Sequence, residues 1–358
     1  MKKVTIMDVA RQAGVSMKSV SRVINNEASV RPDLKAKVDK AVAELGYRPN
    51  FAARALAAGR SFFLGILFDN PSPGYTLQIL NGAYAACRAA GFQLVIESVD
   101  TSASDIRETM DGLLASARLD GMVVTPPACD NAAVIAALDA RKLPYVLLAP
   151  IRDNPEVASV RSNDAAAVHD LVRHLWGLGH RRFGLIDGPA THGASQWRRE
   201  AFVAALEERG HAPSDIVTAT GEFTFSSGIG AGLQIMRAPQ PPTAIFAEND
   251  DMAAGVFAAA AQLGVKIPDD LSVVGFDDSW IARSVWPELT TMRQPIFEMA
   301  EEAVRLLLDF WKTSEVGKKT FDCTLVTRGS TAPLAAEGAQ SSRKSSAAAS
   351  MMASASRR

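Results

Sequence analysis

The chain has 358 residues, of which 47% are hydrophobic and 22% charged, so it is long enough for two or three globular domains with a sizeable core. It has no run of roughly 18 apolar residues that could span a membrane, and no apolar run follows its N-terminal lysines as in a signal peptide. Cys87, Cys129 and Cys323 lie far apart. We therefore expect a cytoplasmic protein with no membrane partner, disulfide framework or structural zinc site.

The charge is distributed unevenly along the chain. Residues 1–60 contain 12 Lys and Arg against 5 Asp and Glu, a net charge of +7, whereas residues 61–333 contain 22 against 33, a net charge of −11. Residues 334–358 carry a net charge of +3. A basic head on an acidic body predicts a protein that presents only its N-terminal part to a polyanion such as DNA.

Residues 5–25 have the pattern of two short helices joined by a tight turn. Thr5, Asp8 and Ser16 are N-cap signals, and Gly14 separates the two helices. Each helix has one apolar face, formed by Val9, Ala10 and Ala13 in the first and by Val20, Val23 and Ile24 in the second. Hydroxyl, amide and basic side chains on the outer face of the second helix suit phosphates and guanine edges, so we predict a DNA-recognition helix. An ordinary helical hairpin with a solvated polar face is the alternative.

Two further helical segments are expected before residue 61. Pro32 suits a first helical turn and Gly46 a C-terminal stop, and the apolar positions between them have helical spacing. Residues 47–60 contain Pro49, a capping Asn50 and an Ala-rich stretch. A helix this short is marginal alone, so we expect it to form only when something holds it.

From residue 62 onward strand and helix patterns alternate, which predicts an α/β fold with doubly wound parallel sheets in two Rossmann-like subdomains. Ligands of such folds bind at the carboxyl ends of the strands, so the loops there should converge on a cleft. Strands are predicted at 63–68, 92–96, 121–124, 145–148, 183–186, 243–246 and 271–276, and helices at 77–90, 104–117, 131–141, 164–178, 195–209, 226–237, 251–263 and 297–312. The tail 334–358 is predicted to be disordered.

Several motifs carry a family resemblance over residues 3–333. They are Ser21-Arg22-Val23-Ile24-Asn25, Leu45 to Asn50, Leu178 to Phe183, Phe246 to Asp250, Val274 to Asp278, Leu289-Thr290-Thr291 with Gln294-Pro295, and Arg328 to Pro333. The chain resembles the LacI-type (LacI/GalR) family of transcriptional repressors. The resemblance implies a helix-turn-helix headpiece at 1–48, a hinge helix or linker at 49–60 and an effector-binding and dimerisation core at 61–333. Within the core it implies an N-subdomain at about 61–161 and 291–322 and a C-subdomain at about 162–290 and 323–333.

The resemblance further implies a homodimer that binds a palindromic double-stranded operator. The DNA-binding residues carried over are the base readers Met17, Lys18 and Arg22, the phosphate anchors Thr5, Ser16, Ser19, Ser21 and Asn25, and the hinge residues Asn50, Arg54 and Leu56. Leu56 would enter a minor-groove step and kink the duplex, unless it is a linker leucine covered by the core. Arg31 departs from the family, which has a small capping residue there, and we expect a cost of about 1 kcal/mol in stability.

The family's core resembles a periplasmic sugar-binding protein with a small effector between its lobes. The implied effector-binding residues are Asp69, Tyr75, Ile79, Arg198, Phe223, Asn249, Asp277 and Gln294. Asn249 and Asp277 could instead be loop caps, and Tyr75 and Phe223 could be core or interface aromatics. Ala149-Pro150 replaces the family's acidic-basic pair, and residues 69–75 carry a Pro-Gly turn instead of a phenylalanine pair. We expect a sugar or sugar derivative rather than a purine.

Enzyme readings find little support in the sequence. Gly228-Ile229-Gly230-Ala231-Gly232 resembles a dinucleotide loop, but Leu233 stands at the third glycine position. The histidines lack metal-ligand spacing, and neither a Gly-x-Ser-x-Gly elbow nor a Walker loop occurs. We therefore expect no catalysis, no cofactor and no metal. A sugar-binding protein of the solute-transport type is the main alternative, and a sugar-modifying enzyme is a more distant one.

Overall fold

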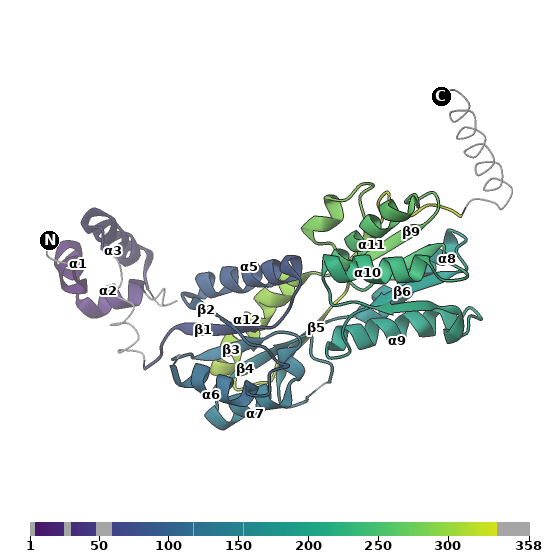
Figure 1. Cartoon of the computed structure of the whole chain (residues 1–358). Helices are drawn as coiled ribbons and strands as arrows, with labels where there is room; N and C mark the ends of the chain where they lie inside the picture. The colour runs from purple at the N-terminus through teal and green to yellow at the C-terminus, as the bar shows by residue number, and fades with distance from the viewer. Residues whose placement is uncertain (1–3, 25–29, 48–58, 117, 153, 335–358) are drawn as a thin grey trace, which may run out of the picture. The chain divides into compact units, whose positions relative to one another are not determined.

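The computed structural model describes residues 4–24, 30–47, 59–116, 118–152 and 154–334. Figure 1 colours the chain from purple at the N-terminus to yellow towards the C-terminus. The chain forms two compact units, one ending at Phe62 and one starting at Phe63. The smaller unit, here called the headpiece, contains the helices α1 (Ile6–Ala13), α2 (Met17–Ile24) and α3 (Pro32–Leu45). These three helices confirm the helices predicted for the described residues of the headpiece. The tail from residue 335 lies outside them.

Two of the three predicted capping signals in the headpiece, Asp8 and Ser16, accept hydrogen bonds from backbone N–H groups, whereas the Thr5 side chain makes no capping hydrogen bond. The Asp8 carboxylate accepts hydrogen bonds from the backbone N–H and the hydroxyl of Thr5, at 2.9 and 2.7 Å. Ser16 Oγ accepts from the N–H of Ser19 at 3.1 Å and so caps α2. Gly14 ends α1 with φ of 65°, a conformation that favours glycine. The three helices share one core, whose buried members are Val9, Ala10, Val20, Val23, Val38 and Ala41.

Helix α3 begins without a capping side chain. Arg31 stands at the N-cap, and its side chain makes no capping hydrogen bond. Its guanidinium instead lies 3.4 Å from the Asp33 carboxylate in an exposed ion pair, which contributes little to stability. Pro32 occupies the first helical turn, where its missing N–H costs nothing.

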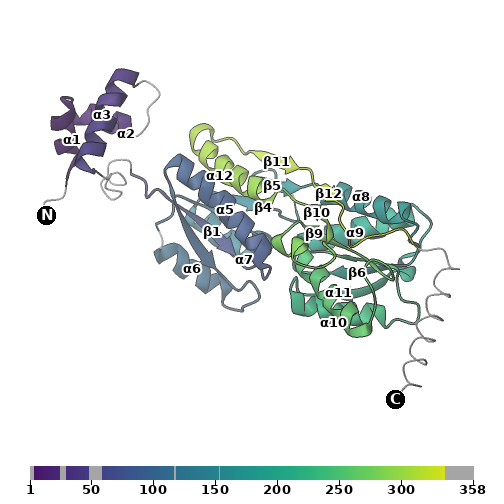
Figure 2. The same cartoon turned by 90° about the horizontal axis from the view of Figure 1, so that it is seen from above.

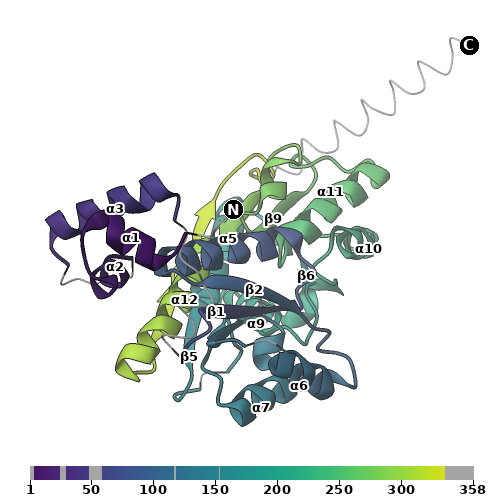
Figure 3. The ribbon, with the colours of Figure 1, turned by 90° about the vertical axis from the view of Figure 1, so that its left-hand side faces the viewer.

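The larger unit has two lobes, each built on a six-stranded sheet. The first lobe has the sheet order β11-β5-β4-β3-β1-β2, with all neighbours parallel. Its strands are β1 (Phe63–Phe68), β2 (Gln93–Ser98), β3 (Gly121–Val124), β4 (Tyr145–Leu148), β5 (Ala158–Ser162) and β11 (Lys318–Phe321), and its helices are α5 (Pro73–Ala90), α6 (Ile106–Ser116), α7 (Ala132–Arg141) and α12 (Ile296–Thr313). Helices α5 and α12 cover one face of this sheet, and α6 and α7 cover the other (Figure 3).

The second lobe has the order β12-β10-β9-β8-β6-β7, in which only the outer pair of β10 and β12 is antiparallel. Its strands are β6 (Phe183–Asp187), β7 (Val217–Thr220), β8 (Ala244–Ala247), β9 (Ser272–Asp277), β10 (Thr290–Arg293) and β12 (Thr324–Val326), and its helices are α8 (Asp164–Gly177), α9 (Gly193–Glu207), α10 (Phe225–Met236) and α11 (Asp250–Leu263). Short 3-10 turns lie at Ala128–Asp130, Pro213–Asp215 and Trp280–Arg283. The fold is the predicted α/β class with two doubly wound subdomains.

The chain passes between the lobes three times, as Figure 2 shows from above. It enters the second lobe after β5, returns to the first lobe after β10 to form α12 and β11, and crosses again to β12. Each lobe is therefore assembled from segments far apart in sequence. Within the described residues, no helix combines the length and apolar character needed to cross a bilayer.

Two kinds of difference from the predicted elements have clear physical causes. The strands β5, β7, β10, β11 and β12 were not predicted, because their sequences contain Ser, Thr, Lys or Arg in place of a continuous apolar run. All five lie in the outer positions of the two sheets. The prediction of a Pro-Gly turn ahead of a helix from residue 77 was wrong, because Pro73 and Gly74 form the first turn of α5.

Candidate ligand cleft and nucleic-acid interface

The outer face of α2 carries the side chains expected at a DNA interface. Ser16, Met17 and Lys18 are exposed, and Ser19, Ser21 and Arg22 are half-buried. Met17 is 50% exposed, so its side chain is accessible to a partner. Thr5 is exposed at the start of α1. Asn25, Asn50, Arg54 and Leu56 lie outside the described residues.

A cavity lies between the two lobes, at the carboxyl ends of their strands. Six of the eight proposed effector residues line it, namely Tyr75, Arg198, Phe223, Asn249, Asp277 and Gln294. Tyr75 comes from α5 of the first lobe, and Arg198 comes from α9 of the second. Asp277 is the last residue of β9, where strand-end geometry predicts a ligand-binding side chain.

Asp69 and Ile79 are not among the residues that line this cavity. Asp69 follows β1, but its carboxylate accepts hydrogen bonds from the N–H of Thr101, at 2.8 Å, and from the Thr101 hydroxyl. Ile79 is fully buried in α5. Asn249 lines the cavity and also caps α11, since its Oδ1 accepts from the N–H of Met252 at 2.9 Å and its Nδ2 donates to the Phe223 carbonyl at 3.0 Å.

A buried ion pair lies at the centre of the cleft. The Arg198 Nε donates to the Asp164 carboxylate at 2.8 Å, and the two side chains are only 5% and 3% exposed. Arg198 Nη1 donates to the Glu248 carbonyl at 2.6 Å, and the guanidinium lies 3.7 Å from the centre of the Phe276 ring. These contacts fix the guanidinium plane toward the cavity.

A chain of hydrogen bonds continues from this ion pair across the cleft. The Ser162 hydroxyl donates to Asp164 and lies 3.1 Å from Gln294 Oε1, and Gln294 Nε2 donates to Asp277 Oδ1 at 2.6 Å. Ser162 and Gln294 stand at two of the points where the chain passes between the lobes. The polar side chains that line the cavity are therefore connected to the segments at which the chain passes between the lobes.

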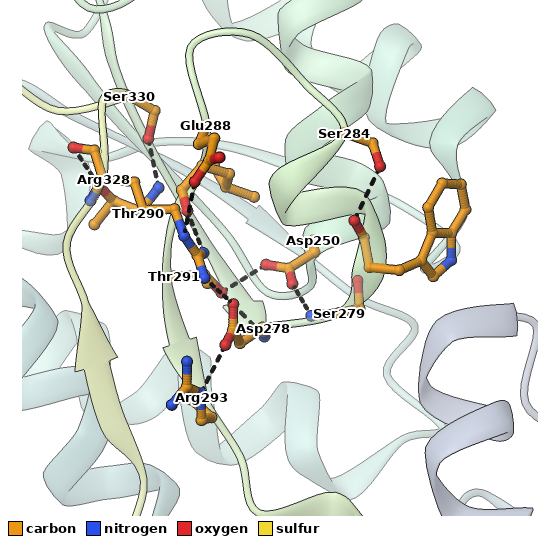
Figure 4. Close-up of polar contacts among 12 residues, drawn as sticks. Asp250, Asp278, Ser279, Ser284, Glu288, Thr290, Thr291, Arg293, Arg328 and Ser330 are labelled. Carbon is orange, nitrogen blue, oxygen red and sulfur yellow. Dashed lines mark hydrogen bonds and ion pairs between the residues drawn. The ribbon is translucent and has the colours of Figure 1, made fainter.

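The loop after β9 holds Asp277 in an unusual backbone conformation, with φ of 115° there and 53° at Asp278. Figure 4 shows how Asp278 is held: its carboxylate accepts from Arg293 at 2.6 Å and from Arg328 at 2.5 Å. Burial opposes ionisation, but these two arginines lower the pKa of Asp278 below its ordinary value. Asp250 completes the arrangement by accepting from the N–H of Ser279 at 2.7 Å.

Two contacts join the lobes near the start of α5. The Ser72 hydroxyl donates to the Asp251 carboxylate at 2.6 Å. A Cβ atom at Gly74 would lie 2.9 Å from Ser279 Cβ, so glycine permits a closer approach than any other residue. The cavity that remains has about 30 Å³ open to the centres of water molecules, room for only a few waters.

Sequence reasoning missed several residues that line the cavity. These are Pro126, Ser162, Asp164, His192, Ala194 and Trp197. Asn70, Ser72 and Ala149 also line the cavity, and they lie in the two segments, residues 69–75 and Ala149-Pro150, at which the sequence departs from the family's effector-binding pattern. His192 is the N-cap of α9, six residues before Arg198, and Trp197 directly precedes Arg198. Neither has the i±3 or i±4 spacing that places two residues on one helix face, so no helical pattern pointed to them. Ser162 and Asp164 could not be found either, because they follow a strand that the apolar pattern did not predict.

Glu248 is fully buried behind the cleft, where its carboxylate accepts from the Gly188 N–H at 2.8 Å and from the Ser195 hydroxyl. Burial raises its pKa from 4.5 to about 8, against the opposing effect of these hydrogen bonds and of Arg198. Because the folded protein holds this proton more tightly than the unfolded chain, the contribution to stability is complete below pH 4.5 and is lost as pH rises through about 8.

Replacing Glu248 with glutamine, which resembles the protonated acid, is expected to remove this pH dependence. Between pH 6 and pH 9 the wild type should lose on the order of 2 kcal/mol more of its free energy of unfolding than the variant. Urea denaturation at both pH values measures the difference. The exposed Glu298→Gln variant is the control and should follow the wild type. Parallel losses in all three proteins would contradict the assignment.

The described residues contain no group of three or more His, Cys, Asp or Glu side chains arranged to hold a metal ion. The histidines instead make other contacts. His180 lies 3.0 Å from the Thr243 hydroxyl and 3.2 Å from the Ala332 carbonyl, and His174 lies 3.1 Å from the Thr331 hydroxyl. Gly228, Gly230 and Gly232 lie within α10. Gly228 and Gly232 pack closely against α11, where the absence of a side chain lets the two helices approach.

Comparisons with known proteins agree with this architecture. Residues 5–50 match the family of bacterial regulatory proteins of the lacI type, and residues 172–331 match the periplasmic binding protein-like domain. The HTH-type transcriptional repressor CytR of Escherichia coli K12 is 32% identical over 333 residues, which cover 92% of this chain and 97% of that protein.

Two solved structures are similar over 92% of this chain and the whole of their own. One is a lac repressor dimer bound to operator and the anti-inducer ONPF, with 28% identity and a TM-score of 0.74. The other is a complex of the transcriptional regulator CelR with cellobiose, with 29% identity and a TM-score of 0.70. Together with the helix-turn-helix headpiece and the two-lobed core, these similarities establish that the chain belongs to the LacI family of bacterial DNA-binding transcriptional repressors.

Proposed function

We propose that this repressor binds a palindromic operator as a homodimer and changes its operator affinity when a sugar or sugar derivative enters the cleft between the lobes. The observation that carries the proposal is the interlobe cavity, where a buried guanidinium, two carboxyl groups and three side-chain amides surround the same space as three aromatic side chains. Sugars offer hydroxyls to the polar groups and apolar ring faces to aromatic side chains. The CelR structure contains cellobiose in complex with a protein of similar fold.

The proposed mechanism couples the angle between the lobes to DNA binding. Ligand entry separates Ser72 from Asp251, and the ligand then bridges Tyr75 of the first lobe and Asp277 of the second. The change in lobe angle reaches the headpieces through residues 49–60, which the family resemblance assigns as the hinge. A ligand can shift operator binding only by the difference in its affinity for the two lobe arrangements.

An apolar surface on the first lobe supports the dimer. Leu77 and Tyr84 are seven residues apart on one face of α5 and are 55% and 54% exposed, and Ile96 on the edge strand β2 is 58% exposed. Leu80 and Ile96 line one shallow depression, so the helix and the strand contribute to a continuous surface. Exposed apolar surface along a sheet edge favours association, and we assign a second copy of this chain as its partner. The similar lac repressor structure is a dimer on its operator.

The headpiece assignment predicts a large effect of Lys18 on operator binding. Replacing Lys18 with alanine should weaken binding to the selected operator at least about tenfold, because a base-edge contact contributes roughly 1–3 kcal/mol. Fluorescence anisotropy with an operator chosen by in vitro selection measures the affinity. Lys35→Ala is the matched control, since Lys35 is exposed on α3 and pairs with Asp39 at 3.1 Å. Equal losses in both variants would remove α2 from the base-reading role.

A further inference from the structure

We propose that the cleft selects an uncharged ligand and excludes sugar phosphates, sugar acids and other anions. This inference rests on the proposed function, because it concerns the effector of the same cleft. Binding an anion in a buried site requires a positive charge that the protein has not already neutralised. The side chains around this cavity leave no such charge for the ligand.

The cation in the cleft is already neutralised. Arg198 is the one Lys or Arg among the described residues that line the cavity, and it forms its ion pair with Asp164 at 2.8 Å. Asp277 adds a second carboxyl group to the same lining. A phosphate that approached Arg198 would therefore also approach two acidic side chains. The cavity lining provides no unneutralised guanidinium whose attraction could offset the free energy needed to desolvate the anion.

Two of the helix N-termini near the cavity, those of α8 and α11, carry acidic side chains of their own, whereas the first turns of α5 and α9 contain none. Such N-termini often attract phosphates through free N–H groups and the helix dipole. Here Asp164 is the first residue of α8, and Asp250 and Asp251 are the first residues of α11. In the first turn of α9, Ser195 donates to the Glu248 carboxyl group. The attraction of these helix ends for anions is thus offset by carboxyl groups of the chain itself.

The remaining groups suit a neutral polyhydroxyl compound. His192 lines the cavity, and its Nε2 is buried without a hydrogen-bond partner among the described residues, so a ligand hydroxyl can satisfy it. Burial lowers the pKa of His192 to about 4, which keeps the ring uncharged at neutral pH. Tyr75, Trp197 and Phe223 provide apolar surfaces around the same space. Hydroxyl groups both donate and accept, so they can serve the carboxyl groups and the histidine together.

Inorganic phosphate tests the proposal on the full-length protein. At equal ionic strength, phosphate should raise the unfolding temperature of the wild type no more than chloride does. Any rise that does occur should be the same in Arg198→Met. Asp164→Asn leaves Arg198 without its counter-charge, so about 50 mM phosphate should raise the unfolding temperature of this variant by about 3 °C or more. Asp170→Asn on the same helix is the matched control and should gain no response, because Asp170 pairs with Arg173 away from the cavity lining.

Two outcomes would overturn the proposal. One is a phosphate response of the wild type that Arg198→Met abolishes, and the other is the absence of any gain in Asp164→Asn. If Asp164→Asn does not fold, Asp164→Ser provides the same test, because it also removes the carboxylate that pairs with Arg198 at 2.8 Å. Operator binding is measured separately, so a chain that binds no operator would refute the proposed function while the phosphate result would still decide the charge preference of the cleft.

Discussion

The Arg198→Met variant is expected to lose about 3–5 kcal/mol of its free energy of unfolding, because removing one partner of a buried ion pair leaves the other charge without compensation. Asp164 would keep only its hydrogen bond from Ser162, inside a site where the carboxylate is 3% exposed. Urea denaturation of the full chain measures the loss. The variant should also lose any ligand response, since the guanidinium lies at the centre of the cleft.

A double-mutant cycle separates the unpaired charge from other consequences of the substitution. In the Arg198→Met, Asp164→Asn double variant the Asp164 carboxylate no longer stands buried without its partner, so much of the lost stability should return. Arg173→Met is the control, because the Arg173–Asp170 pair is 68% and 47% exposed and should contribute at most about 1 kcal/mol. If the double variant lost more free energy of unfolding than the two single variants together, the broken ion pair would not be the cause of the destabilisation.

The Leu77→Glu variant is expected to dissociate into monomers and to bind the operator about 100-fold more weakly than the wild type. A charge at the centre of the apolar surface on α5 opposes association with a second copy, and a monomer engages only one half-site. Analytical ultracentrifugation gives the oligomeric state, and fluorescence anisotropy gives the operator affinity. Thermal unfolding of the same samples verifies that the lobe itself stays folded.

Val316→Glu is the matched control for this prediction. Val316 is an apolar residue with 37% exposure that precedes β11, and β11 lies at the opposite edge of the sheet from β2. The control should remain a dimer with unchanged operator affinity. A dimeric Leu77→Glu protein, or a monomeric Val316→Glu protein, would place the subunit interface elsewhere.

The sequence predicted the fold wherever a single local pattern decides the structure. The buried central strands such as β1 and β9 are continuous apolar runs, and Gly14 and Gly46 end α1 and α3 with positive φ as expected. Outer strands escaped prediction because their stability depends on pairing with a neighbour that is distant in sequence. The clearest case is β11, Lys318-Lys319-Thr320-Phe321, which pairs with β5 more than 150 residues earlier.

For the cleft, the strand-end rule and the family resemblance located residues but could not orient their side chains. Asp277 and Asp69 both follow strands, yet Asp277 lines the cavity while Asp69 binds Thr101 in a neighbouring loop. The pairing of Arg198 with Asp164 and the burial of Glu248 depend on how α8, α9 and β8 pack together. Such tertiary contacts determine the charge of the site, and they cannot be predicted from a local pattern in the sequence.

The most direct test of the central claim is the operator affinity of the full-length protein with and without a sugar that raises its unfolding temperature. A screen of uncharged mono- and disaccharides identifies the sugar by thermal shift, and anisotropy titration then gives the two affinities. We expect the sugar to change the operator affinity of the wild type at least about fivefold, which corresponds to a coupling free energy of roughly 1 kcal/mol. In Asp277→Ala the sugar should leave the operator affinity unchanged. A sugar that stabilises the protein through Asp277 but leaves the operator affinity unchanged would contradict it.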